Sequence, residues 1–253
     1  MAPRPSASRL THFLCIPLVT STSRPQLQKT LSIFKDDAAN CATSGRRFPS
    51  GIPPQAFRPL GTLNLSVGVM SLLSPERQEG ALKILRQLNP TELLSSIKPA
   101  DTRSDAESPG EKSQDTGQDP ASLNITLKGL RSMQETSKTP ALFAPSLDPD
   151  MRLYRFCQKL REVFGDFLVQ DTRPLRLHAP ILNTLYVPGK KTTKKRARKE
   201  RLKLDATELI ARYENFVWME GVRVEKVAIC KVGAQVRKGG QEEHEVVGEV
   251  ELL

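Results

Sequence analysis

Two short segments with the same alternation of polar and apolar residues constrain the fold of this chain most strongly. They are Leu63-Asn64-Leu65-Ser66-Val67 and Leu177-His178-Ala179-Pro180-Ile181. In a β-strand, residues two apart point to the same side. Asn64 and Ser66 are therefore expected on one face of the first strand, and His178 and Pro180 on one face of the second. If the two strands lie side by side, Asn64, Ser66 and His178 surround one cleft.

The rest of the chain alternates between strand and helix patterns. Strands are expected at 10–20, 61–72, 123–130, 141–144, 173–187, 217–233 and 245–253. Helix start signals, such as a capping Ser followed by Pro and Glu, occur at Ser23, Ser74, Asp148 and Asp205. The mixed order, with two strand–helix–strand halves, predicts an α+β fold and argues against a regular parallel sheet.

The composition points to one folded domain with polar inserts. Only 38% of the 253 residues are hydrophobic and 26% are charged, which is low in apolar content for a wholly globular chain. Residues 98–120 are rich in Asp, Glu, Ser, Pro and Gly, so a disordered insert is expected there. The sequence predicts a disordered N-terminus at 1–9, a single domain at 10–253, and a basic loop at 189–203.

The basic loop contributes much of the net charge of +10, which favours a polyanionic partner such as RNA or a nucleotide phosphate. Three interpretations of the loop stay open: a solvated surface loop, a phosphate clamp and a nuclear localisation signal. The clamp would use Lys190 and Lys191, which follow the second motif closely. The signal would use Lys194, Lys195, Arg196, Arg198 and Lys199. We expect a protein of the nucleus, or of both nucleus and cytoplasm.

The remaining features of the sequence exclude several classes of protein. The four cysteines are widely spaced and form no Cys-x-x-Cys pair, so free buried thiols are expected, with no metal site and no cofactor. No apolar run is long enough to span a membrane, and a monomer is expected. The N-terminal residues 4–19 are basic and then apolar, which fits either a strand or a targeting peptide.

The two motif segments resemble those of the 2H phosphoesterase superfamily, whose mark is two copies of His-x-Thr/Ser-x. Here Asn64 stands at the first His position and Pro180 at the second Thr/Ser position. The A-kinase-anchor-type (2',5' RNA ligase-like) domain, found also in a subunit of the activating signal cointegrator complex, is the most similar branch. Its further matches are Thr11–Leu18, Arg58–Leu63, Leu127–Leu130, Asn183-Thr184 and Asp205-Ala206. The resemblance implies a two-lobed fold, with antiparallel sheets flanking a central cleft and helices outside.

In this superfamily the two histidines flank a phosphate as general base and general acid, and the Thr/Ser hydroxyls bond its oxygens. The resemblance therefore implies that His178 is catalytic and that Asn64 and Ser66 bind phosphate. Imidazole titrates near neutral pH and suits such proton transfer. An Asn amide can donate a hydrogen bond but cannot exchange a proton at neutral pH. Pro180 has neither a hydroxyl nor a backbone N–H, so a bulge or strand end is expected beside it.

Three functions from different classes stay open. The first is a protein with a degraded active site that binds RNA or a nucleotide phosphate, within a transcription-coactivator or RNA-processing complex. The second is an active phosphodiesterase on 2',3'-cyclic phosphates or 2',5'-linked RNA, in which His12 or His244 replaces the missing histidine. The third is an adaptor with a vestigial cleft. The residues at positions 64 and 180 favour the first and third, because losing one general acid or base costs about 10²–10⁴ in rate.

Overall fold

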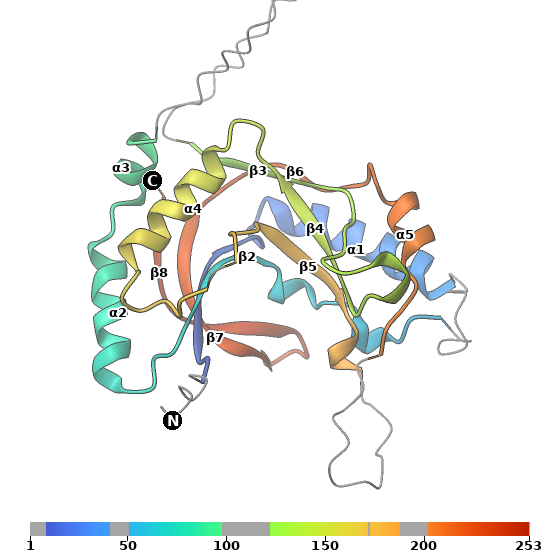
Figure 1. The fold of residues 1–253 in the computed structure, drawn as a ribbon, viewed down its shortest axis with the longest axis horizontal. Coiled ribbons are helices and arrows are strands. Elements are labelled where there is room, and N and C mark those ends of the chain that lie inside the picture. The colour runs from blue at the N-terminus through green and yellow to red at the C-terminus, as the bar shows by residue number, and fades with distance from the viewer. Residues whose placement is uncertain (1–8, 41–50, 98–121, 172, 188–201, 253) are drawn as a thin grey trace, which may run out of the picture.

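The computed structural model describes residues 9–40, 51–97, 122–171, 173–187 and 202–252, which contain eight strands in two antiparallel sheets (Figure 1). The first sheet has the order β2-β1-β7-β8, with β1 His12–Pro17, β2 Asn64–Met70, β7 Lys226–Val236 and β8 Glu242–Glu251. The second has the order β5-β4-β3-β6, with β3 Asn124–Lys128, β4 Ala141–Leu147, β5 His178–Asn183 and β6 Val217–Arg223. The predicted α+β fold with two antiparallel sheets is confirmed.

The helices cover the sheets from two sides. They are α1 Ser23–Asn40, α2 Pro75–Gln87, α3 Pro90–Ser95, α4 Arg152–Val163 and α5 Thr207–Arg212. In Figure 1, α2, α3 and α4 lie at one end of the molecule, and α1 and α5 at the other. The helix α1 follows β1 of the first sheet but packs against β6 of the second, whereas α4 follows β4 of the second sheet and packs against β2 of the first. This exchange of helices ties the two halves into one core.

Local signals explain where the helices begin. The hydroxyl of Ser74 accepts a hydrogen bond of 3.3 Å from the backbone N–H of Arg77, as its capping pattern predicts. The carboxylate of Asp148 accepts bonds from the N–H groups of Leu153 and Tyr154, at 3.0 and 2.7 Å. These side chains satisfy donors that the first helical turn leaves without a partner.

The prediction of one strand at 217–233 was wrong. The chain leaves the second sheet at the end of β6, passes through buried Val224, and enters the first sheet as β7. The alternation of apolar residues continues through this crossing with neither Pro nor Gly, so the pattern alone conceals it. The strand expected at 245–253 begins earlier, at Glu242.

The short helix α3 was not predicted, although its signals are present in the sequence. Asn89 caps it, with its side-chain oxygen 3.1 Å from the N–H of Glu92, and Pro90 occupies the first turn.

The three cysteines in the described residues behave as the sequence predicts. Cys15, Cys157 and Cys230 are buried free thiols, and burial raises the pKa of Cys157. Cys41 lies outside the described residues, as do the predicted disordered insert and all but the last two residues of the basic loop. Among the described helices, none is both long and apolar enough to cross a bilayer.

Candidate functional site

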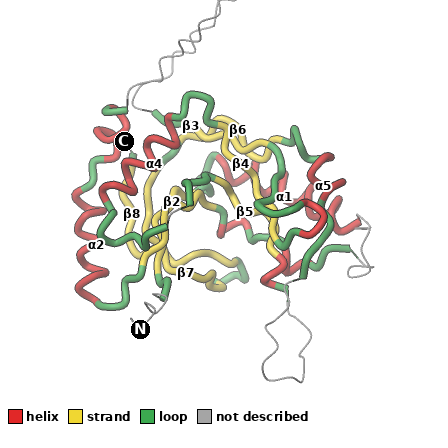
Figure 2. The backbone as a smooth tube through the Cα atoms, in the orientation of Figure 1, coloured by secondary structure: helices red, strands yellow, loops and turns green. Residues whose placement is uncertain are grey.

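The two motif strands meet where the sheets approach each other. β2 is an edge strand of the first sheet and β5 ends the second, and the two strands lie in contact (Figure 2). The chain just before β2 links the sheets, because the N–H of Arg58 donates to the carbonyl oxygen of Ile181 at 2.9 Å. The two segments singled out in the sequence are thus neighbours in space.

Each motif strand turns its polar residues to the face opposite the core. Asn64 and Ser66 are half-buried on β2, and His178 and Pro180 are half-buried on β5. The alternate residues are buried in the core, as expected from the period of two: Leu65, Val67, Ala179 and Ile181.

A cavity of about 560 Å³ lies between the sheets at this point, and Ser66 and His178 both line it. The other lining residues come from β2, the loop around Gln134, α4 and the segment leading into β5. They include Gly68, Met133, Gln134, Arg161, Leu168, Asp171, Arg173 and Arg176. The cavity is thus shared by residues of both motifs.

His178 is held in one tautomer. Its Nδ1 lies 2.7 Å from the carbonyl oxygen of Arg176, and a carbonyl can only accept, so Nδ1 carries the proton. The neutral ring therefore has its lone pair on Nε2. The ring also meets the edge of Phe143, with the ring centroids 4.7 Å apart. Burial lowers the pKa of His178, so the neutral, proton-accepting form predominates at pH 7.

Asn64 is placed differently from Ser66. It lies opposite Pro17 at the start of β2, and its side-chain Nδ2 donates to the backbone oxygen of Thr62 at 3.0 Å. Asn64 shares the face of Ser66 but does not line the cavity that Ser66 and His178 share. One amide hydrogen is already committed to the local turn, and the group offers no titrating atom near His178.

Pro180 lies beside the irregularity that its chemistry predicts. The pairing of β4 with β5 shifts between Leu142 and Phe143, because Leu182 and Pro180 are their partners and Ile181 is the extra residue. A β-bulge of this kind bends the strand and re-aims its side chains. The predicted bulge at Pro180 is confirmed.

Three arginines that the sequence reasoning missed make the cavity cationic: Arg161 of α4, and Arg173 and Arg176 before β5. Only one carboxylate, Asp171, joins them among the described lining residues, and it pairs with Arg173 at 2.7 Å. That contact lowers the pKa of Asp171 to about 2. Two arginines so close before the second motif were the available signal.

A second, more apolar cavity of about 240 Å³ adjoins the first. Met133, Gln134 and His178 line both. Its other walls include Pro140, Phe143, Pro180, Leu182 and Leu185. His178 thus stands between a cationic space and an apolar one, an arrangement suited to a ligand with a phosphate at one end and a flat apolar group at the other.

The predicted phosphate clamp and localisation residues lie outside the described residues. These are Lys190, Lys191, Lys194, Lys195, Arg196, Arg198 and Lys199.

A sequence model of the family described as the AKAP7 2'5' RNA ligase-like domain matches residues 10–247. The chain belongs to this family. The membership expected from the motifs is therefore confirmed, together with its two-sheet phosphoesterase fold. The search of curated proteins found no match.

Solved structures similar to this AKAP7 2'5' RNA ligase-like domain are distant in sequence. LigT of E. coli, complexed with 3'-AMP, is 12% identical over 96% of this chain and 97% of its own, with a TM-score of 0.49. A crystal structure described as a phosphoesterase is 12% identical over the same shares, with a TM-score of 0.48. Usb1 of Kluyveromyces marxianus is 13% identical over 97% and 98%, with a TM-score of 0.35.

Neither of the other histidines of this AKAP7 2'5' RNA ligase-like domain reaches the cavity beside His178. His12 is only 5% exposed, and its Nδ1 lies 2.9 Å from the hydroxyl of Thr11. His244 packs edge-on against Phe13 at 4.9 Å, with its Nδ1 3.1 Å from the oxygen of Gly233. His178 is the one histidine of the chain that lines the described cavities at the motif strands.

Proposed function

We propose that this chain binds a phosphate-bearing ligand, RNA or a nucleotide, in the cavity between β2 and β5, and that it turns over 2',3'-cyclic phosphates very slowly. The observation that carries the proposal is the junction of Ser66 from one sheet with His178 from the other in a cavity bearing three arginines. Arginine matches phosphate oxygens with paired hydrogen bonds. A serine hydroxyl adds a further donor.

The same geometry supports weak chemistry. Hydrolysis of a cyclic phosphate requires a base for the attacking water and an acid for the leaving oxygen. His178 can serve as one of these, because its Nε2 is unprotonated in the neutral ring. Asn64 cannot serve as the other, and Pro180 supplies no hydroxyl. The proposed protein therefore still binds the ligand. Its hydrolysis rate is lower by a factor of about 10²–10⁴, because one general acid or base is missing.

The test compares the natural chain with Ser66→Ala and His178→Ala. AMP and a short oligoadenylate are titrated for affinity, and 2',3'-cyclic AMP and a 2',5'-linked diadenylate are assayed for hydrolysis. We expect the natural chain to bind AMP, both variants to bind it at least about fivefold more weakly, and hydrolysis to be slight.

His244→Asn is the matched control, because His244 also binds a backbone oxygen through Nδ1 and meets an aromatic edge, yet lies outside the cavity. Its affinity is expected to be unchanged. Robust hydrolysis by the natural chain that His178→Ala abolishes would make the protein an enzyme with another proton-transfer group. Unchanged binding in both variants would favour an adaptor with a vestigial cleft.

A further inference from the structure

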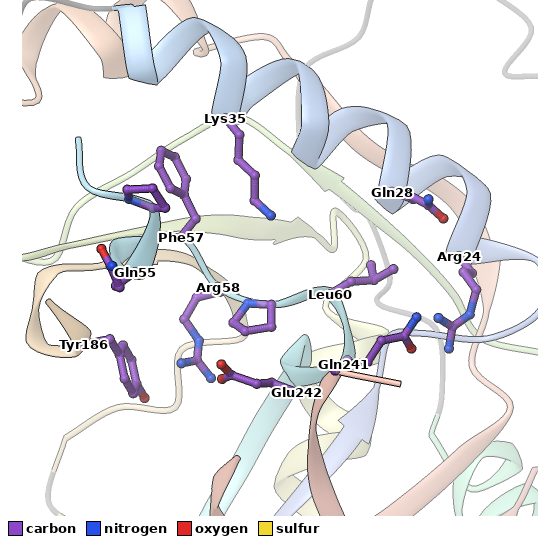
Figure 3. Close-up of a pocket in the computed structure, with 14 residues that line it drawn as sticks. Arg24, Gln28, Lys35, Gln55, Phe57, Arg58, Leu60, Tyr186, Gln241 and Glu242 are labelled. Atoms are coloured by element: carbon purple, nitrogen blue, oxygen red, sulfur yellow. The ribbon is translucent and has the colours of Figure 1, made fainter. Parts of the chain in front are cut away.

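A separate cavity of about 610 Å³ lies where the two sheets are joined (Figure 3). Its walls come from α1, from the start of β8, and from three short 3-10 helices: η1 Pro54–Ala56, η2 Leu60–Thr62 and η4 Thr184–Tyr186. It shares no lining residue with the two cavities at His178. Its volume falls in the range that accommodates ligands of nucleotide size.

Arg58 lies at the centre of this cavity and is held firmly. It is only 5% exposed, and its backbone N–H donates to Ile181 at the edge of β5. The guanidinium carbon lies 4.3 Å from the centre of the Tyr186 ring, a cation–π contact that holds the group in place. Figure 3 shows Tyr186 and Glu242 on either side of the Arg58 side chain.

The charge of Arg58 is not neutralised by an ion pair within the described part of the chain. Burial lowers the pKa of Arg58, and the neighbouring Tyr186 and Glu242 oppose that shift. Charged groups that are this well buried are normally paired, because losing water is costly unless an opposite charge compensates. The charge of Arg58 is therefore available to an anion that enters the cavity.

Two further cations face the same space. Arg24 and Lys35 are exposed on α1, eleven residues apart and so three turns along one face of the helix, with Gln28 between them. Figure 3 shows these side chains extending from α1 toward the segment of Arg58 and Leu60. With Glu242 as the single carboxylate among the lining residues, three positive charges face one negative charge.

We propose that this cavity is a second phosphate site, in which Arg58 binds the phosphate of a nucleotide or of an RNA strand, and Arg24 and Lys35 add positive charge along the wall formed by α1. Three separated positive charges complement a ligand with several negative phosphate charges better than a ligand with a single carboxylate. Glu242 and Gln241, which Figure 3 shows beside Arg58 and Arg24, offer acceptors for hydroxyl groups of the same ligand. The site goes beyond the proposed function, because it requires nothing of His178.

The distance between the two cavities distinguishes a free nucleotide from an RNA strand as the source of the phosphate. His178 begins β5 and Tyr186 lies three residues after its end, so the two sites are separated by the six-residue strand, about 20 Å. A mononucleotide is too short to reach both sites, whereas a single strand of several nucleotides can span them. A ligand that fills both sites gains affinity from the linkage.

The experiment uses the full chain, with inorganic phosphate, AMP and a fluorescein-labelled oligoadenylate of eight nucleotides as probes. Arg58→Gln removes the buried charge, and Arg24→Glu with Lys35→Glu reverses two exposed charges without touching the core. Arg77→Gln is the matched control, because Arg77 also lies over an aromatic ring, that of Phe167 at 5.4 Å, but outside this cavity.

We expect the AMP titration of the natural chain to show two sites. Arg58→Gln and the double reversal should each weaken one of them at least about tenfold, whereas Arg77→Gln leaves both within twofold. If Arg58→Gln does not fold, the double reversal alone decides. Loss confined to the oligoadenylate would identify RNA backbone as the source, and loss with AMP and phosphate would identify a free nucleotide.

Wild-type affinity of the double reversal for all three probes would overturn the proposal. His178→Ala separates this result from a failure of the proposed function, because it affects only the other site. A chain that loses AMP binding through His178→Ala but not through the reversal has the cleft and lacks the second site. If the double reversal weakens AMP binding and His178→Ala does not, the result supports the second site and contradicts the proposed site at His178.

Discussion

The carbonyl oxygen of Arg176 accepts a hydrogen bond of 2.7 Å from Nδ1 of His178. The acceptor comes from the segment that enters β5, two residues before the histidine. This contact fixes the proton on Nδ1 and leaves Nε2 as an acceptor. With the proton fixed in this way, burial beside Phe143 keeps the His178 ring neutral, so it can act as a base but does not add a positive charge to the cavity. The positive charge of the cavity therefore comes from its arginines.

Stability is expected to fall as pH decreases from 7.5 to 5.5. Burial lowers the pKa of all three histidines, His12, His178 and His244. The unfolded chain takes up these protons near pH 6.5, while the folded chain takes them up only at lower pH, so protonation favours unfolding in this window. The measurement is the urea midpoint at the two pH values. A midpoint that is equal or higher at pH 5.5 would contradict the assignment.

His178→Asn isolates the contribution of the cleft. Because Asn does not titrate, this variant is expected to lose less stability between pH 7.5 and 5.5 than the natural chain. Most native carboxylates titrate below this window, so they add little to the difference.

The basic run at 190–201 is proposed to direct the protein to the nucleus. Replacing Lys194, Lys195, Arg196 and Arg198 by Gln should move a chain fused to a large fluorescent tag into the cytoplasm. Lys29→Gln with Lys83→Gln, two exposed cations elsewhere, is the control and should leave the distribution unchanged. If the variant with all four substitutions is still enriched in the nucleus, the run is not a localisation signal, and the phosphate clamp and the solvated loop remain as its interpretations.

The sequence predicted the strand faces well because they depend only on local periodicity. The alternation of Asn64 and Ser66 with Leu65 and Val67 requires one buried face, and the structure has it. The bulge beside Pro180 followed from the absence of an N–H. What periodicity does not carry is the destination of a strand. The crossing at Val224 between two sheets has no turn residue to mark it.

In the candidate site, too, the residues set by local periodicity were predicted and those brought in by long-range packing were not. Ser66 and His178 were predicted from the pattern, but Arg161 and Arg176 reach the cavity from α4 and from the approach to β5, which only the fold brings together. Arg58 was singled out only as the first residue of the segment Arg58–Leu63 that resembles the family, with no binding role. Its burial depends on Tyr186, far along the chain, and on the edge of β5. Long-range packing of this kind leaves no local signature.

Trp218 is expected to be the most costly core residue to truncate. It is fully buried, its Nε1 donates to the oxygen of Gly129 at 2.8 Å, and its ring meets Phe34 and Phe216 edge-on at 5.2 and 4.9 Å. Trp218→Ala should cost about 3–5 kcal/mol. Trp218→Phe should cost about 1–3 kcal/mol, because it leaves the carbonyl without its donor.

Circular dichroism in urea gives the free energy of unfolding for these variants. Val236→Ala is the control, since Val236 is 69% exposed and should change stability by less than about 0.5 kcal/mol. A cost for Trp218→Ala no larger than that of the control would show that the aromatic cluster does not hold the helix α1 against β6.

Restoring both motifs should raise the rate of cyclic phosphate hydrolysis. Asn64→His with Pro180→Thr returns a titrating group to the face of Ser66 and a hydroxyl to the face of His178. From the acid–base contribution alone, the gain is expected to be about 10²-fold or more. The assay follows 2',3'-cyclic AMP and a 2',5'-linked dinucleotide, and compares the double variant with each single one. His178→Ala placed in the double variant should abolish the gain, because the two imidazoles act as base and acid together.

If the folded double variant is no faster than the natural chain, the cleft has diverged at more than these two positions. Arg161 and Arg176 would then serve binding alone, and an adaptor role would become the leading explanation.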